Sequence, residues 1–185
     1  MLGLWNTVRA TLVQTIMLTS INTLPDSSRI WIFAADRKLS SAETNELLST
    51  LDEYLAGWKA HGAPVQAGKE LRYDQFVIIA ANPDVTAPSG CSIDDMTRAI
   101  KSLGEKFKVD FFGALKVFYR VGDDIIVNDR ATFKSKSRTG EIDEETIVFD
   151  NSLISLADFR AGKWELPAGE SWHKSMLHRE TAEVI

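Results

Sequence analysis

The sequence Phe76-Val77-Ile78-Ile79-Ala80 is an unbroken apolar run in which three residues are β-branched. A run of this kind is typical of a strand at the centre of a sheet, covered on both faces. We therefore predict a strand region over 71–81. Upstream, Arg29-Ile30-Trp31-Ile32-Phe33-Ala34 has a similar composition and predicts a second buried strand. Buried strands need other elements to cover them, which indicates a fold that combines sheets and helices.

Two amphipathic helices are predicted on either side of the 71–81 region. Ser40 and Glu43 form a capping box, and the apolar residues that follow recur at the spacing of one helical face. We expect this helix to end at His61-Gly62, because Gly62 can adopt the left-handed conformation that closes many helices. The second helix is expected to start from an N-cap at Ser92. Its predicted inward face comprises Ile93, Met96, Ile100, Leu103 and Phe107.

The second half of the chain carries weaker signals. Gly122-Asp123-Asp124 lies between two apolar runs and predicts a β-hairpin. We expect a basic helix or turn over 130–138, a strand over 146–149 and a short helix over 152–160. The predicted fold class is α+β, a single domain over residues 21–175 with a mixed β-sheet flanked by helices.

The two ends of the chain are assigned separately. Residues 1–20 predict an N-terminal amphipathic helix or an upstream extension, since Met17 is an alternative start. The apolar stretch there is far shorter than the ~20 residues of a spanning helix, so we expect no membrane span. It also lacks the uninterrupted core and cleavage site of a secretory signal, which favours a cytoplasmic protein. Residues 176–185 are expected to form a flexible tail.

The amino-acid composition excludes several classes of protein. The 185 residues include 26 acidic and 21 basic side chains, so the net charge is −5 at pH 7, and 44% of residues are hydrophobic. These are the proportions of an ordinary soluble domain. A pI near 5.3 argues against a nucleic-acid partner. The single cysteine excludes an internal disulfide and the usual cysteine-built zinc sites, and we expect no metal and no cofactor.

That cysteine, Cys91, lies where a helix is expected to begin. Free backbone N–H groups and the positive end of the helix dipole favour a thiolate there, and they could equally hold a phosphate or carboxylate ligand. However, free cysteines are most often buried, and Asp94 and Asp95 add negative charge that opposes a thiolate. Packing, ligand binding and nucleophilic catalysis are therefore the three alternatives for Cys91.

A cysteine nucleophile needs a base, and His173 is the candidate because Trp172 beside it could hold it against the domain. The alternative is a satisfied surface histidine next to a packing tryptophan. Near the first strand, Asp26 and Ser27 predict a turn. Arg29 at the strand entry could also clamp a carboxylate or phosphate group.

Three segments carry a resemblance to a known family: Leu24-Pro25-Asp26-Ser27-Ser28-Arg29-Ile30-Trp31, Ser89-Gly90-Cys91-Ser92-Ile93-Asp94 and Ser171-Trp172-His173. They resemble a family of small bacterial proteins, found mainly among Bacteroidetes and their relatives, that often carry the label "ABC transporter ATPase". The resemblance covers about residues 20–175. An ABC ATPase needs a G-x-x-x-x-G-K-[ST] loop and an LSGGQ-type signature, and the sequence contains neither. We therefore expect no ATP hydrolysis.

The resemblance implies that eight residues belong to one shared feature: Asp26, Ser28, Arg29, Cys91, Ser92, Asp94, Trp172 and His173. If that feature is one pocket, its cation, hydroxyls, helix start and imidazole suit a small anionic ligand. If the segments are scattered, they are turns and caps that the fold requires.

Three functions remain open. The first is binding of a small anionic ligand without catalysis, by Asp26, Ser28, Arg29, Ser92, Asp94 and Trp172. The second is a cysteine-dependent hydrolase or thiol transferase, with Cys91 as the nucleophile and His173 as the base. The third is a structural or interaction module, such as a homodimer formed through an apolar face of residues 1–16.

Overall fold

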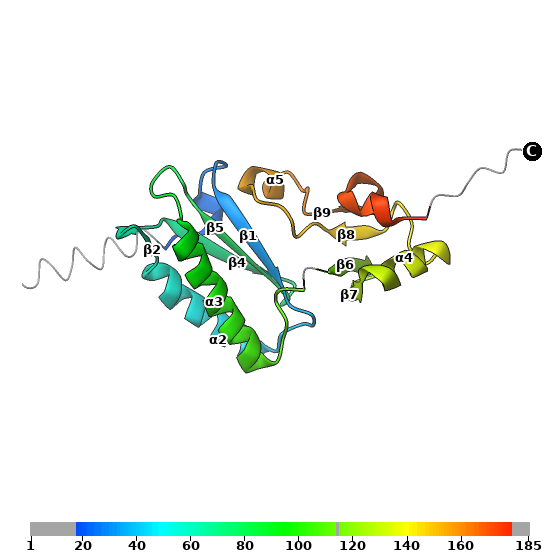
Figure 1. Cartoon of the computed structure of the whole chain (residues 1–185), viewed down its shortest axis with the longest axis horizontal. Coiled ribbons are helices and arrows are strands. Elements are labelled where there is room, and N and C mark those ends of the chain that lie inside the picture. The colour runs from blue at the N-terminus through cyan, green and yellow to red at the C-terminus, as the bar shows by residue number, and fades with distance from the viewer. Residues whose placement is uncertain (1–17, 114, 179–185) are drawn as a thin grey trace, which may run out of the picture. The chain divides into compact units, whose positions relative to one another are not determined.

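The computed structural model describes residues 18–113 and 115–178, which group into two compact units (Figure 1). The first unit contains the described residues up to 112 together with Leu153–Ala157. The second contains those of Gly113–Ser152 and 158–178. Helices and antiparallel sheets build both units, so the predicted α+β class is confirmed. The single-domain boundary at 21–175 stays a prediction, and each unit is described by itself.

The first unit is built on a three-stranded sheet. Its strands are β1 (Arg29–Ala34), β4 (Ala67–Arg72) and β5 (Phe76–Ala81), in the order β1-β5-β4. β5 is central, and all six of its residues are buried, as its apolar run predicted. Both neighbours pair with it antiparallel, which places Trp31 opposite Ile79 and Arg29 opposite Ala81.

Two helices cover one face of this sheet (Figure 1). α2 (Ser41–Ala56) starts with the predicted capping box of Ser40 and Glu43. α3 (Gly90–Phe107) buries the inward face that its spacing predicted, although Ile93 is only partly buried. Arg37 ties the two helices together, because its guanidinium donates to the Glu43 carboxylate at 2.8 Å and to the Phe107 carbonyl at 2.7 Å. The bond from Arg37 lowers the pKa of Glu43 to about 2.

Three boundaries in this unit differ from the prediction. α2 ends at Ala56, and His61-Gly62 instead forms the turn between β2 (Lys59–Ala60) and β3 (Ala63–Pro64). The predicted strand region over 71–81 is divided by a tight turn at Tyr73 and Asp74, whose φ angles are 57° and 51°. The N-cap of α3 is Ser89 rather than Ser92. In each case a polar residue or a glycine ends or begins the element a few positions away from the residue that we predicted.

The opposite face of the sheet is covered in part by the segment before β1. It contains the 3-10 helix η1 (Ile21–Thr23), capped by Ser20. The Thr19 amide donates to the Ala67 carbonyl at 2.9 Å, and Ile21 is buried. Gly68 lies directly beneath, where a Cβ atom would approach the Thr19 carbonyl oxygen to 2.6 Å. Glycine is therefore required at this position of β4.

The second unit contains a four-stranded sheet in the order β7-β6-β8-β9. Its strands are β6 (Lys116–Val121), β7 (Asp124–Asp129), β8 (Ile147–Phe149) and β9 (Glu165–Pro167). The β6–β7 pair is the predicted hairpin, with Gly122 in its turn at φ 59°.

Helical segments complete the second unit. α4 (Arg130–Arg138) packs Phe133 into a core formed with Tyr119 and Val148. The 3-10 helices η2 (Ala168–Glu170) and η3 (Trp172–Met176) follow β9. α5 (Leu156–Arg160) is shorter than the helix predicted over 152–160, and it begins in the first group of residues and ends in the second.

The prediction of one mixed sheet was wrong. The described strands form three separate sheets in which all pairs are antiparallel, and the parallel contact in the described residues is the isolated bridge between Leu18 and Ala67. The β4–β5 hairpin places β5 between β1 and β4 and antiparallel to both, so no parallel pair forms in this sheet. Packing also extends beyond 175, since Met176 is buried. The described residues do not include 1–17 or 179–185. The predicted N-terminal helix with its dimer face and most of the predicted tail therefore lie outside them.

Among the described residues, none of the helices combines the length and the hydropathy that a membrane span requires.

Candidate functional site

The first turn of α3 is open. Ser89 and Ser92 form a capping box in which the Ser92 amide donates to Ser89 Oγ at 3.2 Å and the Ser89 amide donates to Ser92 Oγ at 2.9 Å. Gly90 and Cys91 lie between these two serines. Their backbone amides have no acceptor within the helix because they belong to its first turn. Both residues are exposed, and a Cβ atom added at Gly90 would meet nothing within 4 Å. This helix end is therefore accessible to a ligand.

The Cys91 side chain is exposed, so the packing alternative for this residue was wrong. Asp94 is exposed one turn further along. Asp95 forms an ion pair with Arg98, which partly offsets its negative charge. The thiol therefore projects from the first turn of α3, on the surface of the first unit.

Arg29, at the start of β1, makes no ion pair or side-chain hydrogen bond with a described residue. Its guanidinium carbon lies 4.9 Å from the centre of the Trp31 ring, a cation–π contact. Trp31 in turn contacts Trp58 edge-on, with ring centroids 6.0 Å apart. The Trp58 indole N–H donates to the Ser92 carbonyl at 3.1 Å. A continuous line of aromatic contacts thus joins Arg29 to the first turn of α3.

Tyr54 donates to the same carbonyl of Ser92 as Trp58 does. Its hydroxyl donates to the Ser92 carbonyl at 3.2 Å, and burial raises its pKa to about 12, so the hydroxyl keeps its proton at neutral pH. Tyr54 lies in α2 and Trp58 just after its end, yet both donors fix the start of a different helix, α3. The signal for this role is the polar atom of each ring, which needs a partner when the ring is buried.

The segment that precedes β1 forms the predicted turn, since the Ser28 amide donates to the Pro25 carbonyl at 2.9 Å. Ser27 Oγ donates to Asp84 at 2.7 Å, which joins this turn to the loop between β5 and α3. Asp26 is exposed. Ser28 is only 1% exposed, and its hydroxyl has no hydrogen-bond partner among the described residues. Two of the three family-like segments therefore lie at the same end of the first unit.

The third segment lies in the second unit. Trp172 and His173 stack with ring centroids 3.9 Å apart, and the Trp172 indole N–H donates to Asp150 at 3.0 Å. Arg130 lies over the Trp172 ring at 5.3 Å. His173 Nδ1 and Ser171 Oγ are 2.9 Å apart. Asp150 and Arg130 are neighbours of this segment that the sequence did not indicate.

The alternative of a surface histidine was wrong, because His173 is only 1% exposed. Burial lowers the pKa of His173 to about 4; Asp150 acts in the opposite direction, and Arg130 adds to the lowering. The imidazole is therefore neutral at pH 7. A base with so low a pKa takes up a proton weakly, which makes His173 a poor general base in this state.

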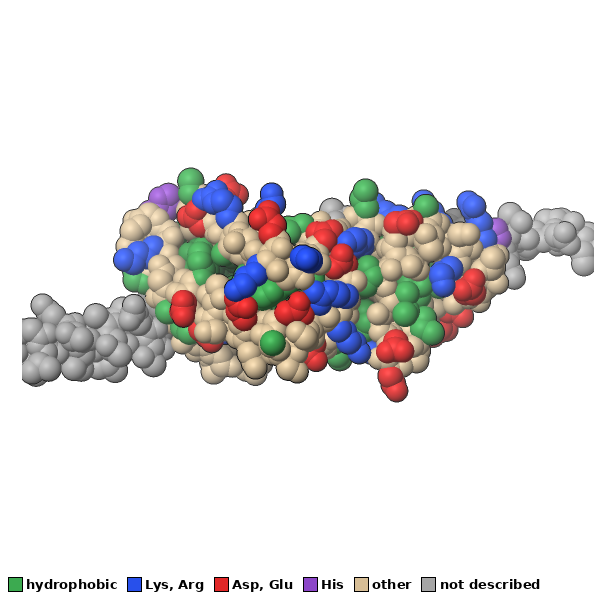
Figure 2. Space-filling model, turned by 90° about the horizontal axis from the view of Figure 1, so that it is seen from below, with side chains coloured by type: hydrophobic (Ala, Val, Ile, Leu, Met, Phe, Trp, Pro, Cys, Tyr) green, Lys and Arg blue, Asp and Glu red, His purple; other side chains and the backbone are tan. Residues whose placement is uncertain are grey.

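Arg29, Ser92 and Cys91 thus lie in the first unit, and Trp172 and His173 lie in the second. On the face shown in Figure 2, basic and acidic side chains are interspersed rather than segregated. Within residues 18–113 and 115–178, no group of three His, Cys, Asp or Glu side chains could hold a metal ion.

No protein-family model matches this chain, and comparisons with curated proteins and with solved structures give no significant match. The resemblance carried by the three segments stays a prediction.

Proposed function

We propose that this protein binds a small anionic ligand, such as a phosphate or carboxylate group, at the first turn of α3. The observation that carries the proposal is the line of contacts from Arg29 through Trp31 and Trp58 to the Ser92 carbonyl. It links a guanidinium that makes no ion pair with a described residue to the helix turn that has two amides without an intrahelical acceptor. Both groups favour an anion, through charge-assisted hydrogen bonds and through the helix dipole.

The aromatic contacts give this arrangement its rigidity. Trp58 and Tyr54 both donate to one carbonyl of α3, so the helix start cannot shift without breaking two hydrogen bonds. The Trp31 ring lies against the guanidinium of Arg29. A preorganised cation and amide pair loses little conformational entropy on binding. Binding without catalysis, in the cytoplasm and without ATP hydrolysis, is the function we assign.

Inorganic phosphate is expected to stabilise the protein against heat. At one hundred times its dissociation constant, a ligand that binds only the folded state adds about 2.7 kcal/mol of stability. For a chain of this size that raises Tm by roughly 5–10 °C. We expect Arg29→Met to remove most of this shift, because methionine keeps the apolar contact with Trp31 and lacks the charge.

Two control variants separate binding from folding. Arg72→Met removes the same charge at the opposite end of the sheet and should leave the phosphate shift unchanged. Gly90→Ala fits without a clash, so it should fold normally while its methyl group obstructs the approach to the first turn. The proposal is wrong if neither phosphate nor sulfate raises Tm, or if Arg29→Met and Arg72→Met respond alike.

The exposure of Cys91 favours a second candidate function, thiol chemistry. We expect iodoacetamide to label Cys91 in the folded protein without denaturant, since the side chain is exposed. Phosphate bound at the same turn should slow the labelling several-fold. Mass spectrometry of the single labelled site measures both effects. Labelling that appears only in urea would contradict the exposed position.

A further inference from the structure

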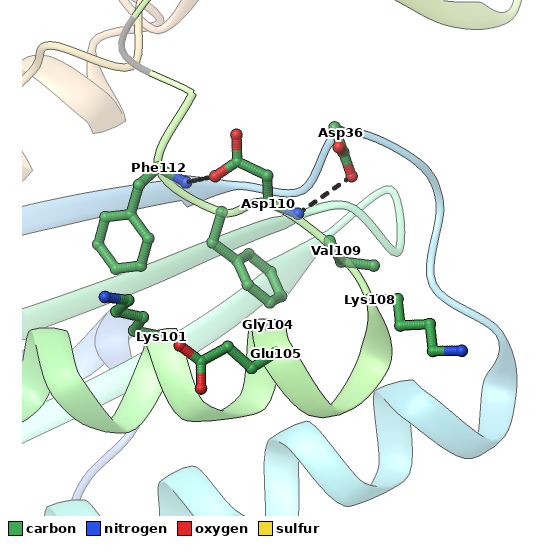
Figure 3. Close-up of a pocket in the computed structure, with 9 residues that line it drawn as sticks. Asp36, Lys101, Gly104, Glu105, Lys108, Val109, Asp110 and Phe112 are labelled. Atoms are coloured by element: carbon green, nitrogen blue, oxygen red, sulfur yellow. Dashed lines mark hydrogen bonds between the residues drawn. The ribbon is translucent and has the colours of Figure 1, made fainter.

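The first unit contains a pocket of about 630 Å³ at the other end of α3 (Figure 3). Its walls come from the last turns of α3, from the segment after the helix and from Asp36, which follows β1. This volume is within the range of ~300–1,000 Å³ that small-molecule sites occupy. The pocket lies at the end of α3 opposite to Cys91, so it is separate from the proposed anion site.

The wall beyond the helix is apolar. Val109 and Phe111 are almost fully buried, and Phe112 packs edge-on against Phe33 with ring centroids 5.5 Å apart while 39% of it remains exposed. Gly104 brings the helix backbone close to this wall, since a Cβ atom there would lie 2.7 Å from the Val109 carbonyl oxygen. An exposed phenyl ring in a concave site offers contact area to an apolar ligand group.

Two side chains of opposite charge line the pocket from the same face of α3. Lys101 and Glu105 are four residues apart, which places them one turn from each other. Neither forms an ion pair or a side-chain hydrogen bond with another described residue. Figure 3 shows Glu105 directed towards the Lys101 side of the pocket, whereas the ammonium of Lys108 is directed away.

The two carboxylates on the other wall of the pocket, those of Asp36 and Asp110, already accept hydrogen bonds from the backbone, unlike that of Glu105. The Asp36 carboxylate accepts a hydrogen bond from the Asp110 backbone amide at 3.2 Å. The Asp110 carboxylate accepts one from the Phe112 backbone amide at 2.9 Å (Figure 3). These bonds hold the segment after α3 in place and form the shape of the pocket. Lys101 and Glu105 are therefore the polar groups that a ligand would engage.

We propose that this pocket binds a small zwitterion with an apolar body, of the α-amino acid type. Its carboxylate would accept a hydrogen bond from the Lys101 ammonium, and its ammonium would donate to the Glu105 carboxylate. Its apolar side chain would lie against Phe112 and Val109. A ligand with a single charge would satisfy only one of the two groups on α3, so the pair selects for both charges together.

Isothermal titration of the full-length protein with three related probes tests the proposal. L-Phenylalanine carries both charges, 2-phenylethylamine only the ammonium and 3-phenylpropionate only the carboxylate. We expect L-phenylalanine to bind about tenfold more tightly than either analogue, the effect of one charge-assisted hydrogen bond. If a singly charged analogue binds as tightly, or if no probe binds, the proposal is overturned.

Variants of exposed residues locate the site without risk to the fold. Lys101→Met and Glu105→Gln should each weaken L-phenylalanine binding about tenfold. The matched changes Lys59→Met and Glu53→Gln, which also concern exposed side chains of the first unit, should leave it unchanged. Equal losses in both sets would refute the assignment. Phosphate stabilisation should survive Lys101→Met, so failure here and failure of the anion site can be distinguished.

Discussion

Lowering the pH from 7 to 4 is expected to cost the second unit on the order of 3 kcal/mol of stability through His173 alone. The pKa of this imidazole is about 4 in the folded protein and about 6.5 in an unfolded chain. The unfolded state therefore binds more protons between these values. A difference of roughly 2.5 pKa units corresponds to about 3 kcal/mol.

The direction follows from which state takes up the proton. Well above pH 6.5 the histidine is neutral in both states, and the stability is fully present. As the pH falls from 6.5 to 4, the unfolded chain is protonated while the buried imidazole is not, so stability is lost. Below pH 4 both states are protonated and this contribution stays constant. Glu43, whose pKa is lowered to about 2, acts below pH 4.5 and so outside most of this window.

Urea unfolding of the wild type and of His173→Gln measures the effect. Glutamine is uncharged and can still hydrogen-bond to Ser171 Oγ, so the variant should be less dependent on pH between 7 and 5. We expect the wild type to approach the variant in stability as the pH falls. A free-energy difference between the two proteins that stays constant over this range would show that His173 titrates normally.

The elements that the sequence predicted well depend on local signals. β5 is buried on both faces because every residue of its run is apolar. The start of α2 needs only the pair Ser40 and Glu43, which bond to each other's backbone. The helix or turn predicted over 130–138 is observed as α4, which Asp129 caps. In each case the residues that decide the structure are within a few positions of one another.

The misplaced boundaries arise where two local signals compete. Ser89 and Ser92 can both cap a helix, and the box that they form together makes Ser89 the N-cap. His61-Gly62 suits a helix end as well as a hairpin turn, and the pairing of Lys59 with Pro64 selects the turn. Which signal decides the boundary depends on a tertiary contact or on the register of strand pairing, and the sequence pattern alone contains neither.

The candidate site was predicted only in part for the same reason. The sequence indicated Arg29 and the helix near Cys91 separately. Their connection runs through Trp58, which is 34 positions from Ser92 and bonds to its carbonyl only because α2 and α3 lie on the same face of the sheet. The burial of His173 likewise depends on Phe133 of α4, whose ring lies 6.1 Å from the imidazole.

Gly68→Ala is expected to destabilise the first unit by roughly 3 kcal/mol, the upper end of the usual cost of overpacking. Alanine normally stabilises a strand relative to glycine by about 0.5–1 kcal/mol, so the expected sign is opposite to the general rule. The added Cβ would lie 2.6 Å from the Thr19 carbonyl oxygen and 2.9 Å from the Ile21 nitrogen. Both are backbone atoms, and no side-chain rotation relieves the clash.

The segment over β4 cannot simply move away from the new methyl group. The Thr19 amide is bonded to the Ala67 carbonyl, and Ile21 is buried beneath it, so displacement breaks a hydrogen bond and exposes an apolar side chain. Gly57→Ala is the matched control, since its Cβ would meet only ordinary contacts at 3.7 Å. Urea unfolding of both variants should show a large loss for Gly68→Ala and little change for Gly57→Ala. Equal stabilities would mean that the chain before β1 does not lie against β4.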